Sequence, residues 1–220
     1  ENFTISGAGL REGIMFNQAL PSTIEKPVSD VLTYSLTTLV KWYDCDEKHV
    51  EHVVNLSIQL FKQLRVLHKF PRQYLKVLKV AATLHDCGMR IKYYNHQRHS
   101  WYMILNANLY GVTHREIVLA AFTACCHKKE DINPLDWARF KDILHEDDIE
   151  IVKRLGVMLR IAESLDRSMS GCIKGINCDI LGDSVSMKTE VEGDASLEIR
   201  DAMAAGAEFK KSFHKNLEIL

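Results

Sequence analysis

The sequence lacks the features that mark several classes of protein. Its 220 residues carry a formal net charge of −1, so no excess of positive charge favours DNA or another nucleic acid as a partner. No run of about 18 apolar residues occurs, so we expect no membrane span. The first residues, ENFTISGAGLREG, have neither a basic start nor an apolar stretch, and they do not resemble a signal peptide.

Cysteine pairs at metal-binding or redox spacing are also missing. The six cysteines are scattered, none forms a CxxC pair, and Cys125 adjoins Cys126. This pattern indicates reduced thiols in a cytoplasmic protein rather than a disulfide scaffold or a zinc ribbon. Apolar residues make up 46% of the chain and charged residues 26%, which is typical of a globular protein.

Most of the chain has the periodicity of amphipathic helices. Apolar residues recur every three or four positions, and capping residues precede several of these stretches, with Asp46 and Thr113 as examples. Glu116 stands three residues after Thr113, as in a capping box. We expect helices over approximately 30–43, 46–70, 71–85, 99–111, 113–126, 132–144 and 147–166.

The two ends of the chain differ from this helical body. Residues 175–199, GINCDILGDSVSMKTEVEGDASLEI, alternate and contain Gly-Asp pairs, which predicts a meander of short strands. Residues 201–220 predict a final helix and an edge strand. At the front, ENFTIS predicts a short strand, GLREGIMFNQAL a short helix, and PSTIEKPVSD a linker with two prolines. The expected fold is mainly α, with a small α/β part at the C-terminal end.

Histidines and aspartates gather near the predicted helix ends. In AATLHDCGM, His85 and Asp86 adjoin where an apolar helix finishes, and a buried charge there needs compensation. Imidazole and carboxylate together suit a divalent ion such as Mn, Fe, Zn or Mg, which would supply that compensation. The residues in this pattern are His49, His85, Asp86, His96, His99, His127 and Asp166.

Other interpretations of these residues stay open at this point. A single histidine near a helix end is more often a cap or a surface residue than a ligand. Asp86 can begin a turn with Cys87 and Gly88. Arg98, Lys128 and Arg167 each adjoin a residue of the pattern and are candidates for phosphate binding, although most such side chains lie on solvated faces.

The order of these residues resembles that of the HD-domain phosphohydrolase superfamily. HVEHV, LHDCG and LDRS match the superfamily's first, central and last motifs. The resemblance implies an HD-domain-like helical bundle in which His49, His85, Asp86 and Asp166 hold a divalent metal that acts on phosphate esters. It also implies that His99 and His127 form a further histidine set, which would complete the metal shell beside Asp86 or protonate the leaving group.

A narrower resemblance covers nearly the whole chain. SGAGLREGIMF, HVEHVVNLSIQLFKQL, HQRHSWYMILN, CCHKK and RIAESLDRS together resemble the C-terminal half of the exopolyphosphatase/guanosine-pentaphosphatase (Ppx/GppA) family. The resemblance implies that residues 1–28 are the remnant of an upstream actin-like phosphatase domain with a linker. Residues 29–170 would then be the HD-like domain and residues 171–220 a small α/β subdomain.

The resemblance therefore implies the C-terminal portion of an exopolyphosphatase-like phosphohydrolase. Its expected partners are polyphosphate or a phosphorylated nucleotide, together with the upstream actin-like domain. The alternative is a non-catalytic module that binds polyphosphate or forms a homodimer for an actin-like catalytic half. In a third interpretation the histidines are structural and no metal binds.

Overall fold

The computed structural model describes residues 9–19, 30–128 and 132–220. The strand predicted in residues 1–6 and nearly all of the predicted linker lie outside these ranges. So does most of segment 1–28, which the sequence assigns to an upstream domain. That assignment, like the boundary near residue 170, stays a prediction.

The described chain is mainly helical, as the sequence predicts, and no helix in it is both long and apolar enough to cross a membrane. The helices are α1 (Leu10–Ala19), α2 (Val31–Trp42), α3 (Glu47–Gln63), α4 (Arg65–His68), α5 (Gln73–Leu84), α6 (His96–Leu105), α7 (His114–Cys125), α8 (Pro134–Ala138), α9 (Asp148–Ser164), α10 (Ser196–Met203) and α11 (Gly206–Phe213), with a short 3-10 turn, η1 (Cys87–Arg90), after α5.

Side-chain caps fix the starts of three helices where the sequence predicts them. The carboxylate of Asp30 accepts a hydrogen bond from the backbone N–H of Thr33, and that of Asp46 accepts one from His49. Thr113 and Glu116 form the predicted capping box at the start of α7. These short polar side chains satisfy N–H groups that have no partner within the helix.

Three predicted helices have clearly different bounds in the structure, and the one expected over 132–144 is limited to Pro134–Ala138. The helix expected over 46–70 is divided at Leu64 into α3 and α4, and Lys69 then adopts a left-handed conformation with φ 55°. The helix expected from about His99 begins at His96 and ends at Leu105. Asn95, at its N-cap, is a residue type that favours helix starts, but it has φ 59° and makes no side-chain cap bond.

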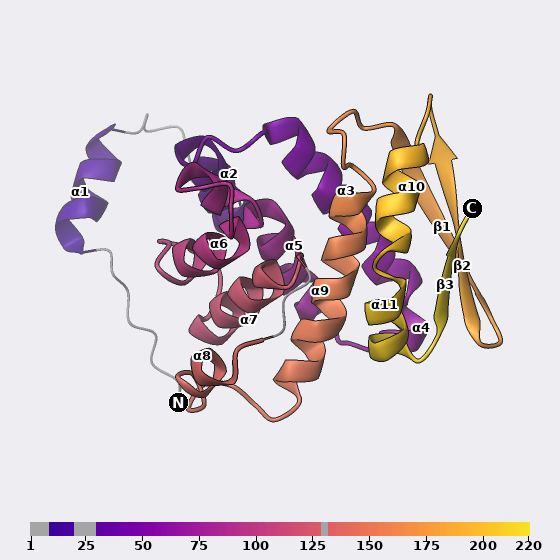
Figure 1. The fold of residues 1–220 in the computed structure, drawn as a ribbon. Helices are drawn as coiled ribbons and strands as arrows, with labels where there is room; N and C mark the ends of the chain where they lie inside the picture. Colours follow the sequence, from indigo (N-terminus) through magenta and orange to yellow (C-terminus); the bar gives the residue numbers. More distant parts are fainter. Residues whose placement is uncertain (1–8, 20–29, 129–131) are drawn as a thin grey trace.

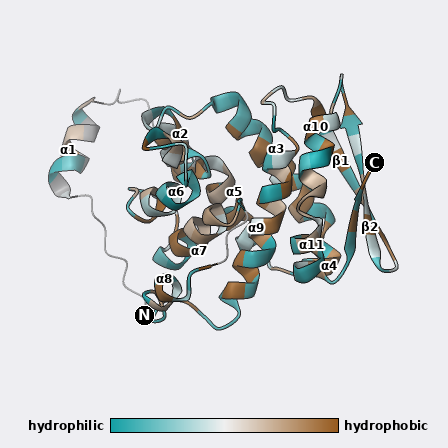
Figure 2. Ribbon diagram, in the orientation of Figure 1, coloured by the Kyte–Doolittle hydropathy of each residue, from teal (hydrophilic) through white to brown (hydrophobic). Residues whose placement is uncertain are grey.

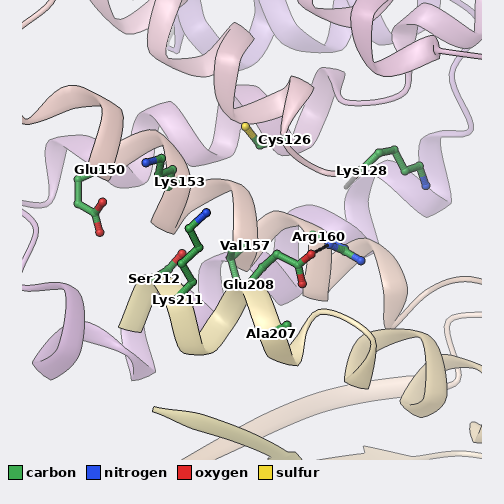
Figure 3. Close-up of a pocket in the computed structure, with 10 residues that line it drawn as sticks. All are labelled: Cys126, Lys128, Glu150, Lys153, Val157, Arg160, Ala207, Glu208, Lys211 and Ser212. Carbon is green, nitrogen blue, oxygen red and sulfur yellow. Dashed lines mark ion pairs between the residues drawn. The ribbon is translucent and has the colours of Figure 1, made fainter. Parts of the chain in front are cut away.

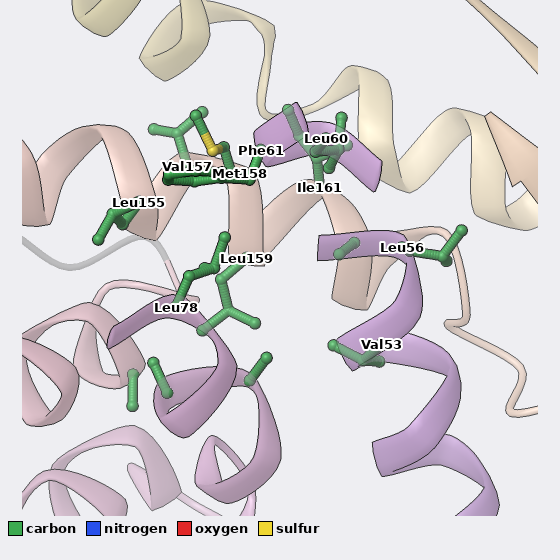
Figure 4. Close-up of a cluster of buried hydrophobic side chains, with 14 of the residues drawn as sticks. Val53, Leu56, Leu60, Phe61, Leu78, Leu155, Val157, Met158, Leu159 and Ile161 are labelled. Carbon is green, nitrogen blue, oxygen red and sulfur yellow. The ribbon is translucent and has the colours of Figure 1, made fainter. Parts of the chain in front are cut away.

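Four helices enclose the hydrophobic core. α3 packs against α5 and α9, and α7 packs against the same two helices (Figure 1). Leu56 and Leu60 of α3, Leu78 of α5, and Leu155 and Leu159 of α9 are fully buried there, and Figure 4 shows Leu78 next to Leu159. Figure 2 shows hydrophobic and hydrophilic residues intermixed along α3 and α9, which is expected of helices that bury only one side.

The C-terminal part forms a three-stranded sheet whose topology differs from the predicted meander. β1 (Ile173–Leu181) and β2 (Ser184–Val191) form an antiparallel hairpin, and β3 (Asn216–Ile219) pairs parallel to β2 at the edge. Two helices, α10 and α11, precede β3 where one was predicted, and they lie between α9 and the sheet (Figure 1). A parallel partner requires such a crossover.

Glutamines on α3 attach the sheet to the helical body. Gln59 accepts a hydrogen bond from the backbone N–H of Ile176 at 3.0 Å, and Gln63 bonds to the backbone of Ile176 and Cys178. These bonds satisfy backbone groups at the outer edge of β1, which would otherwise be open to pairing with another strand.

Trp101, Tyr102 and Phe122 fall at helical spacing in the sequence, which predicts that they pack in the core, but the structure divides them between core and surface. Phe122 is buried and its ring lies 5.7 Å from that of the half-buried Trp101. Tyr102 is 60% exposed, so its assignment to the core was wrong. It follows Trp101 directly on α6, and consecutive residues on a helix point to different sides.

Candidate metal centre

The end of α5 presents His85 and Asp86 to the same interior space. His85 is the C-cap of α5 and keeps helical backbone angles, whereas Asp86 leaves the helix with φ −102° and ψ 2°. The Nε2 atom of His85 lies 3.4 Å from the Oδ2 atom of Asp86. The helix end therefore lets two consecutive side chains converge, which the interior of a helix would not allow.

A glycine brings this helix end against α6. The N–H of Gly88 donates a hydrogen bond to the hydroxyl of Ser100 at 2.9 Å. A Cβ atom at position 88 would lie 2.2 Å from the carbonyl oxygen of His96 and 2.4 Å from the nitrogen of Ser100. Only glycine permits this approach, and the approach carries His96 to Asp86.

The first group of candidate ligands consists of His49, His85 and Asp86. His49 comes from the first turn of α3, and its Nε2 atom lies 3.8 Å from Oδ2 of Asp86. One ligand atom from each of the three residues lies within 4.8 Å of the other two, and all three residues have little solvent exposure. The Nε2 atoms of His49 and His85 are buried without a hydrogen-bond partner in the described chain.

The second group consists of Asp86, His96 and His127, so Asp86 belongs to both groups. The Oδ1 atom of Asp86 lies 3.2 Å from Nε2 of His96 and 3.6 Å from Nε2 of His127. The two Nε2 atoms are 3.0 Å apart, and His127 is fully buried. We refer to His49, His85, Asp86, His96, His127 and Asp166 together as the Asp86 cluster.

Hydrogen bonds fix the same tautomer in all four imidazoles. The Nδ1 atoms of His85, His96 and His127 each contact the backbone carbonyl three residues earlier, at 2.9, 2.8 and 2.5 Å. Nδ1 of His49 lies 2.8 Å from the carboxylate of Asp166. Because these oxygens can only accept, each Nδ1 carries the proton, and the neutral rings turn unprotonated Nε2 atoms toward Asp86.

When the four rings are neutral, the centre of the cluster contains several acceptors and these side chains supply no donor there. Burial acts to raise the pKa of Asp86, but the neighbouring His85, His96 and His127 outweigh it and hold that pKa far below its usual value. Burial lowers the pKa of His49, yet its bond to Asp166 and the charge of Asp86 leave that pKa above the ordinary value. Burial and the nearby His85 keep the pKa of His127 well below the ordinary value.

Asp166, which follows α9, contacts His49 through the Nδ1 atom of the imidazole. One carboxylate oxygen accepts the Nδ1–H of His49, and the other accepts the backbone N–H of Gly171 at 2.9 Å. That second oxygen also lies 4.0 Å from Nε2 of His52. Neither group of candidate ligands includes Asp166. The arrangement is that of a carboxylate that orients a ligand histidine, and a direct role of Asp166 in metal binding stays a prediction.

A small cavity leads from the cluster to the surface. It has a volume of about 230 Å³, and His49 and Asp86 line its inner part. Tyr43, Met89 and Met169 also line it, as do Asp44 and Arg90, which form an exposed ion pair at 3.2 Å. Asp46 lines it as well, so three carboxylates face the single guanidinium of Arg90, and an anion would need a cation at Asp86 to enter.

The remaining predicted site residues lie outside both groups. His99 is half-buried beside Gly88 and belongs to neither group of candidate ligands. Arg98 forms an ion pair with Asp136 at 3.1 Å. Lys128 and Arg167 both pair with Glu163, at 2.8 and 3.1 Å. The roles assigned to these four residues from the sequence stay predictions.

His96 is the cluster member that the sequence interpretation passed over in favour of His99. Both lie on the same side of a helix, three residues apart, so periodicity alone does not distinguish them. The close contact at Gly88 does not separate them either, because it involves the carbonyl oxygen of His96 and the Cβ atom of His99 alike.

Comparisons with known proteins relate most of the chain to one family. The model for domain III of the Ppx/GppA phosphatases matches residues 31–200. The chain is 30% identical over 114 residues to a guanosine-5′-triphosphate,3′-diphosphate pyrophosphatase of Aeromonas salmonicida (strain A449), covering 51% of the chain and 22% of that protein. It is 26% identical over 133 residues to the protein of the same name from Pseudoalteromonas translucida (strain TAC 125), covering 59% and 26%. The matched part thus spans about a quarter of the length of these relatives.

Proposed function

The chain belongs to the Ppx/GppA phosphatase family, and from this premise we propose that its Asp86 cluster is an HD-type centre that binds divalent metal and hydrolyses phosphoester or phosphoanhydride bonds. The observation that carries the proposal is the convergence of unprotonated Nε2 atoms on a buried carboxylate. Acceptors at 3.0 to 3.8 Å from one another repel unless a cation or shared protons lie between them.

The donor set suits Mn, Mg, Fe or Zn, because it combines imidazole nitrogens with a carboxylate. His49 and His85 would bind on one side of Asp86, and His96 and His127 on the other, with the carboxylate shared. Asp166 would orient His49 through its Nδ1–H. A divalent cation held there would polarise phosphoryl oxygens and activate water for attack on phosphorus.

We infer the substrate class from the relatives and from the volume of the small cavity that His49 and Asp86 line. The similar proteins are named for the hydrolysis of a phosphorylated guanosine nucleotide, and polyphosphate shares its chain of phosphoanhydride bonds. The 230 Å³ cavity at His49 and Asp86 has room for a terminal phosphate group rather than a whole nucleotide. We therefore propose that the end of a phosphate chain enters this cavity while the rest of the substrate stays outside.

The test is metal content and hydrolysis in the Asp86→Asn variant. Asparagine keeps the size of the side chain but removes the charge that both ligand groups share. We expect purified wild-type protein to retain a divalent metal in elemental analysis and to release phosphate from tripolyphosphate or guanosine pentaphosphate. The variant should lose both properties, and a chelator should suppress hydrolysis by the wild type.

Asp179→Asn is the matched control, since Asp179 is an exposed aspartate of β1 that pairs with Lys188 and belongs to neither ligand group. It should keep metal and activity. Equal metal content in the Asp86→Asn variant would show that the metal binds elsewhere. Hydrolysis that persists unchanged after chelation would overturn the metal-dependent mechanism.

One observation favours the non-catalytic alternative. Arg98, Lys128 and Arg167 were predicted to hold phosphate beside the metal, but each forms an ion pair with an acidic side chain outside the cluster. A module that binds polyphosphate or forms a homodimer for an actin-like catalytic domain would need no such residues at the metal. In that case the chain would bind metal or phosphate chains in the same experiment without releasing phosphate.

A further inference from the structure

A single basic side chain, that of Arg90, lines the small cavity that leads to the Asp86 cluster. Arg90 is the last residue of η1, the 3-10 turn that follows Asp86. Figure 3 shows a larger cavity of about 630 Å³ beside α9 and α11 with more cations, among them Lys153 and Lys211, but no residue of the Asp86 cluster lines it. Arg90 is therefore the cation placed to act on an anion beside Asp86.

The ion pair that Arg90 forms is open to solvent on both sides. Its guanidinium lies 3.2 Å from the carboxylate of Asp44, which also lines the small cavity. The side chains of Arg90 and Asp44 are 62% and 78% exposed. Such a pair contributes little to stability, because water solvates the separated charges almost as well. Arg90 can therefore exchange Asp44 for another anion at little cost.

The cations that the sequence places next to cluster residues are held more firmly. Lys128 and Arg167 both pair with Glu163, whose side chain is only 7% exposed. Separation of such a pair leaves a buried carboxylate without compensation, which is costly. Partner exchange is thus easier for Arg90 than for Lys128 or Arg167.

The charges of the small cavity make anion binding depend on a cation. The carboxylates of Asp44, Asp46 and Asp86 outnumber the one guanidinium, which leaves a net charge of −2 when the histidines are neutral. This charge repels a free phosphate ion. A divalent cation at the Asp86 cluster would cancel it, so metal and phosphate should bind cooperatively.

We propose that Arg90 holds the terminal phosphate of the substrate, and that it exchanges Asp44 for this phosphate once a divalent cation occupies the Asp86 cluster. The inference rests on the proposed function and adds the residue that binds the phosphate. A guanidinium suits this role because its planar donors bind two phosphate oxygens at once. Asp44 competes with the phosphate for Arg90, so loss of Asp44 and loss of Arg90 should have opposite effects.

Calorimetric titration with inorganic phosphate tests the proposal, on protein that retains its divalent metal and on the same protein after chelation. Wild-type protein should bind phosphate more tightly with metal than without it. In the metal-loaded state, Arg90→Gln should weaken binding about tenfold, through loss of charge-assisted hydrogen bonds. Arg90→Lys should restore only part of the affinity, since lysine keeps the charge but not the planar donors. Asp44→Asn should strengthen binding about two- to fivefold.

Two control variants each remove one positive charge elsewhere. Lys92 is exposed two residues after Arg90 but does not line the small cavity, and Lys153 lines the larger cavity. Lys92→Gln and Lys153→Gln should leave the phosphate affinity of the metal-loaded protein unchanged. A loss in Lys92→Gln equal to that in Arg90→Gln would mean general electrostatic attraction, and an equal loss in Lys153→Gln would place the phosphate in the larger cavity; either result refutes the role of Arg90.

Elemental analysis of each protein separates this inference from the proposed function on which it rests. Arg90→Gln and Asp44→Asn should keep the metal content of the wild type, because neither residue belongs to a group of candidate ligands. Wild-type protein that retains no metal would refute the proposed function and this inference together. Bound metal with the same phosphate affinity in the wild type, Arg90→Gln and Asp44→Asn would refute the inference alone.

Discussion

At the scale of single residues, the Asp86 cluster depends on how each imidazole is held. His85, His96 and His127 lie at or next to a helix end, and the Nδ1 atom of each bonds to the backbone carbonyl three residues earlier. The Nδ1 atom of His49 bonds to the carboxylate of Asp166 instead. Each Nδ1 is thereby occupied and each Nε2 is turned inward. The sequence shows which residue types are present, but this choice of nitrogen depends on ring rotation, which no sequence pattern encodes.

His96 and His99 allow the assignment of the second ligand group to be tested. We expect His96→Ala to lower metal content and metal affinity, because Nε2 of His96 lies 3.2 Å from Asp86 and 3.0 Å from His127. The loss should be at least as large as the roughly 10- to 100-fold effect of removing an outer-shell partner. Elemental analysis and competition with a metal indicator measure both quantities.

His99→Ala is the matched control on the same helix. It removes an imidazole of the same size one turn later, outside both ligand groups, so metal content should stay at the wild-type level. If His99→Ala loses metal and His96→Ala keeps it, then the set inferred from the sequence is right and the assignment to His96 is not.

At the scale of elements, the sequence predicted those features that depend on neighbouring residues. Asp46 and Thr113 begin helices because their side chains cap N–H groups two or three residues away, and this pattern is visible in the sequence. The break at Leu64 was missed because apolar periodicity continues through it. The parallel pairing of β3 with β2 was missed because it joins segments separated by two helices.

Gly88 connects the end of α5 to α6, and its replacement should disturb both stability and metal binding. A Cβ atom there would meet the backbone of α6 at 2.2 Å, and backbone atoms cannot yield as a flexible side chain can. We expect Gly88→Ala to destabilise the protein by about 1–3 kcal/mol, as overpacking does. It should also weaken metal binding, because the displaced α6 carries His96. Thermal unfolding and metal titration measure the two effects.

Gly206→Ala serves as the reference for this prediction. A Cβ atom at position 206 meets nothing within 4 Å, and the residue lies at the start of α11, where alanine favours the helix. Its stability should match or exceed that of the wild type. A Gly88→Ala protein that is equally stable would show that η1 and α6 can separate without cost.

At the scale of the whole molecule, the Asp86 cluster joins segments that are distant along the chain. His49 lies at the start of α3, His85 and Asp86 at the end of α5, His96 on α6, His127 after α7 and Asp166 after α9. Apart from α6, these are the four helices that enclose the hydrophobic core, so packing brings the ligands together before any ion binds. The order of the motifs in the sequence predicted that these residues converge. That Asp86 belongs to both groups of candidate ligands depends on helix packing, and only the structure reveals it.

Because the ligands come from several helices, we expect a bound metal to raise the free energy of unfolding of the whole helical body. An ion that binds only the folded state adds about 2.7 kcal/mol at a concentration a hundredfold above its dissociation constant. For a protein of this size, that corresponds to a rise in Tm of about 5–10 °C. Differential scanning calorimetry with increasing Mn²⁺ or Zn²⁺ should show one transition that moves upward, because the ligands come from helices that share one core. Asp86→Asn should show no metal-dependent shift. A rise of equal size in that variant would place the stabilising ion outside the cluster, whereas a transition that splits in two would show that the metal holds only a local part of the helical body.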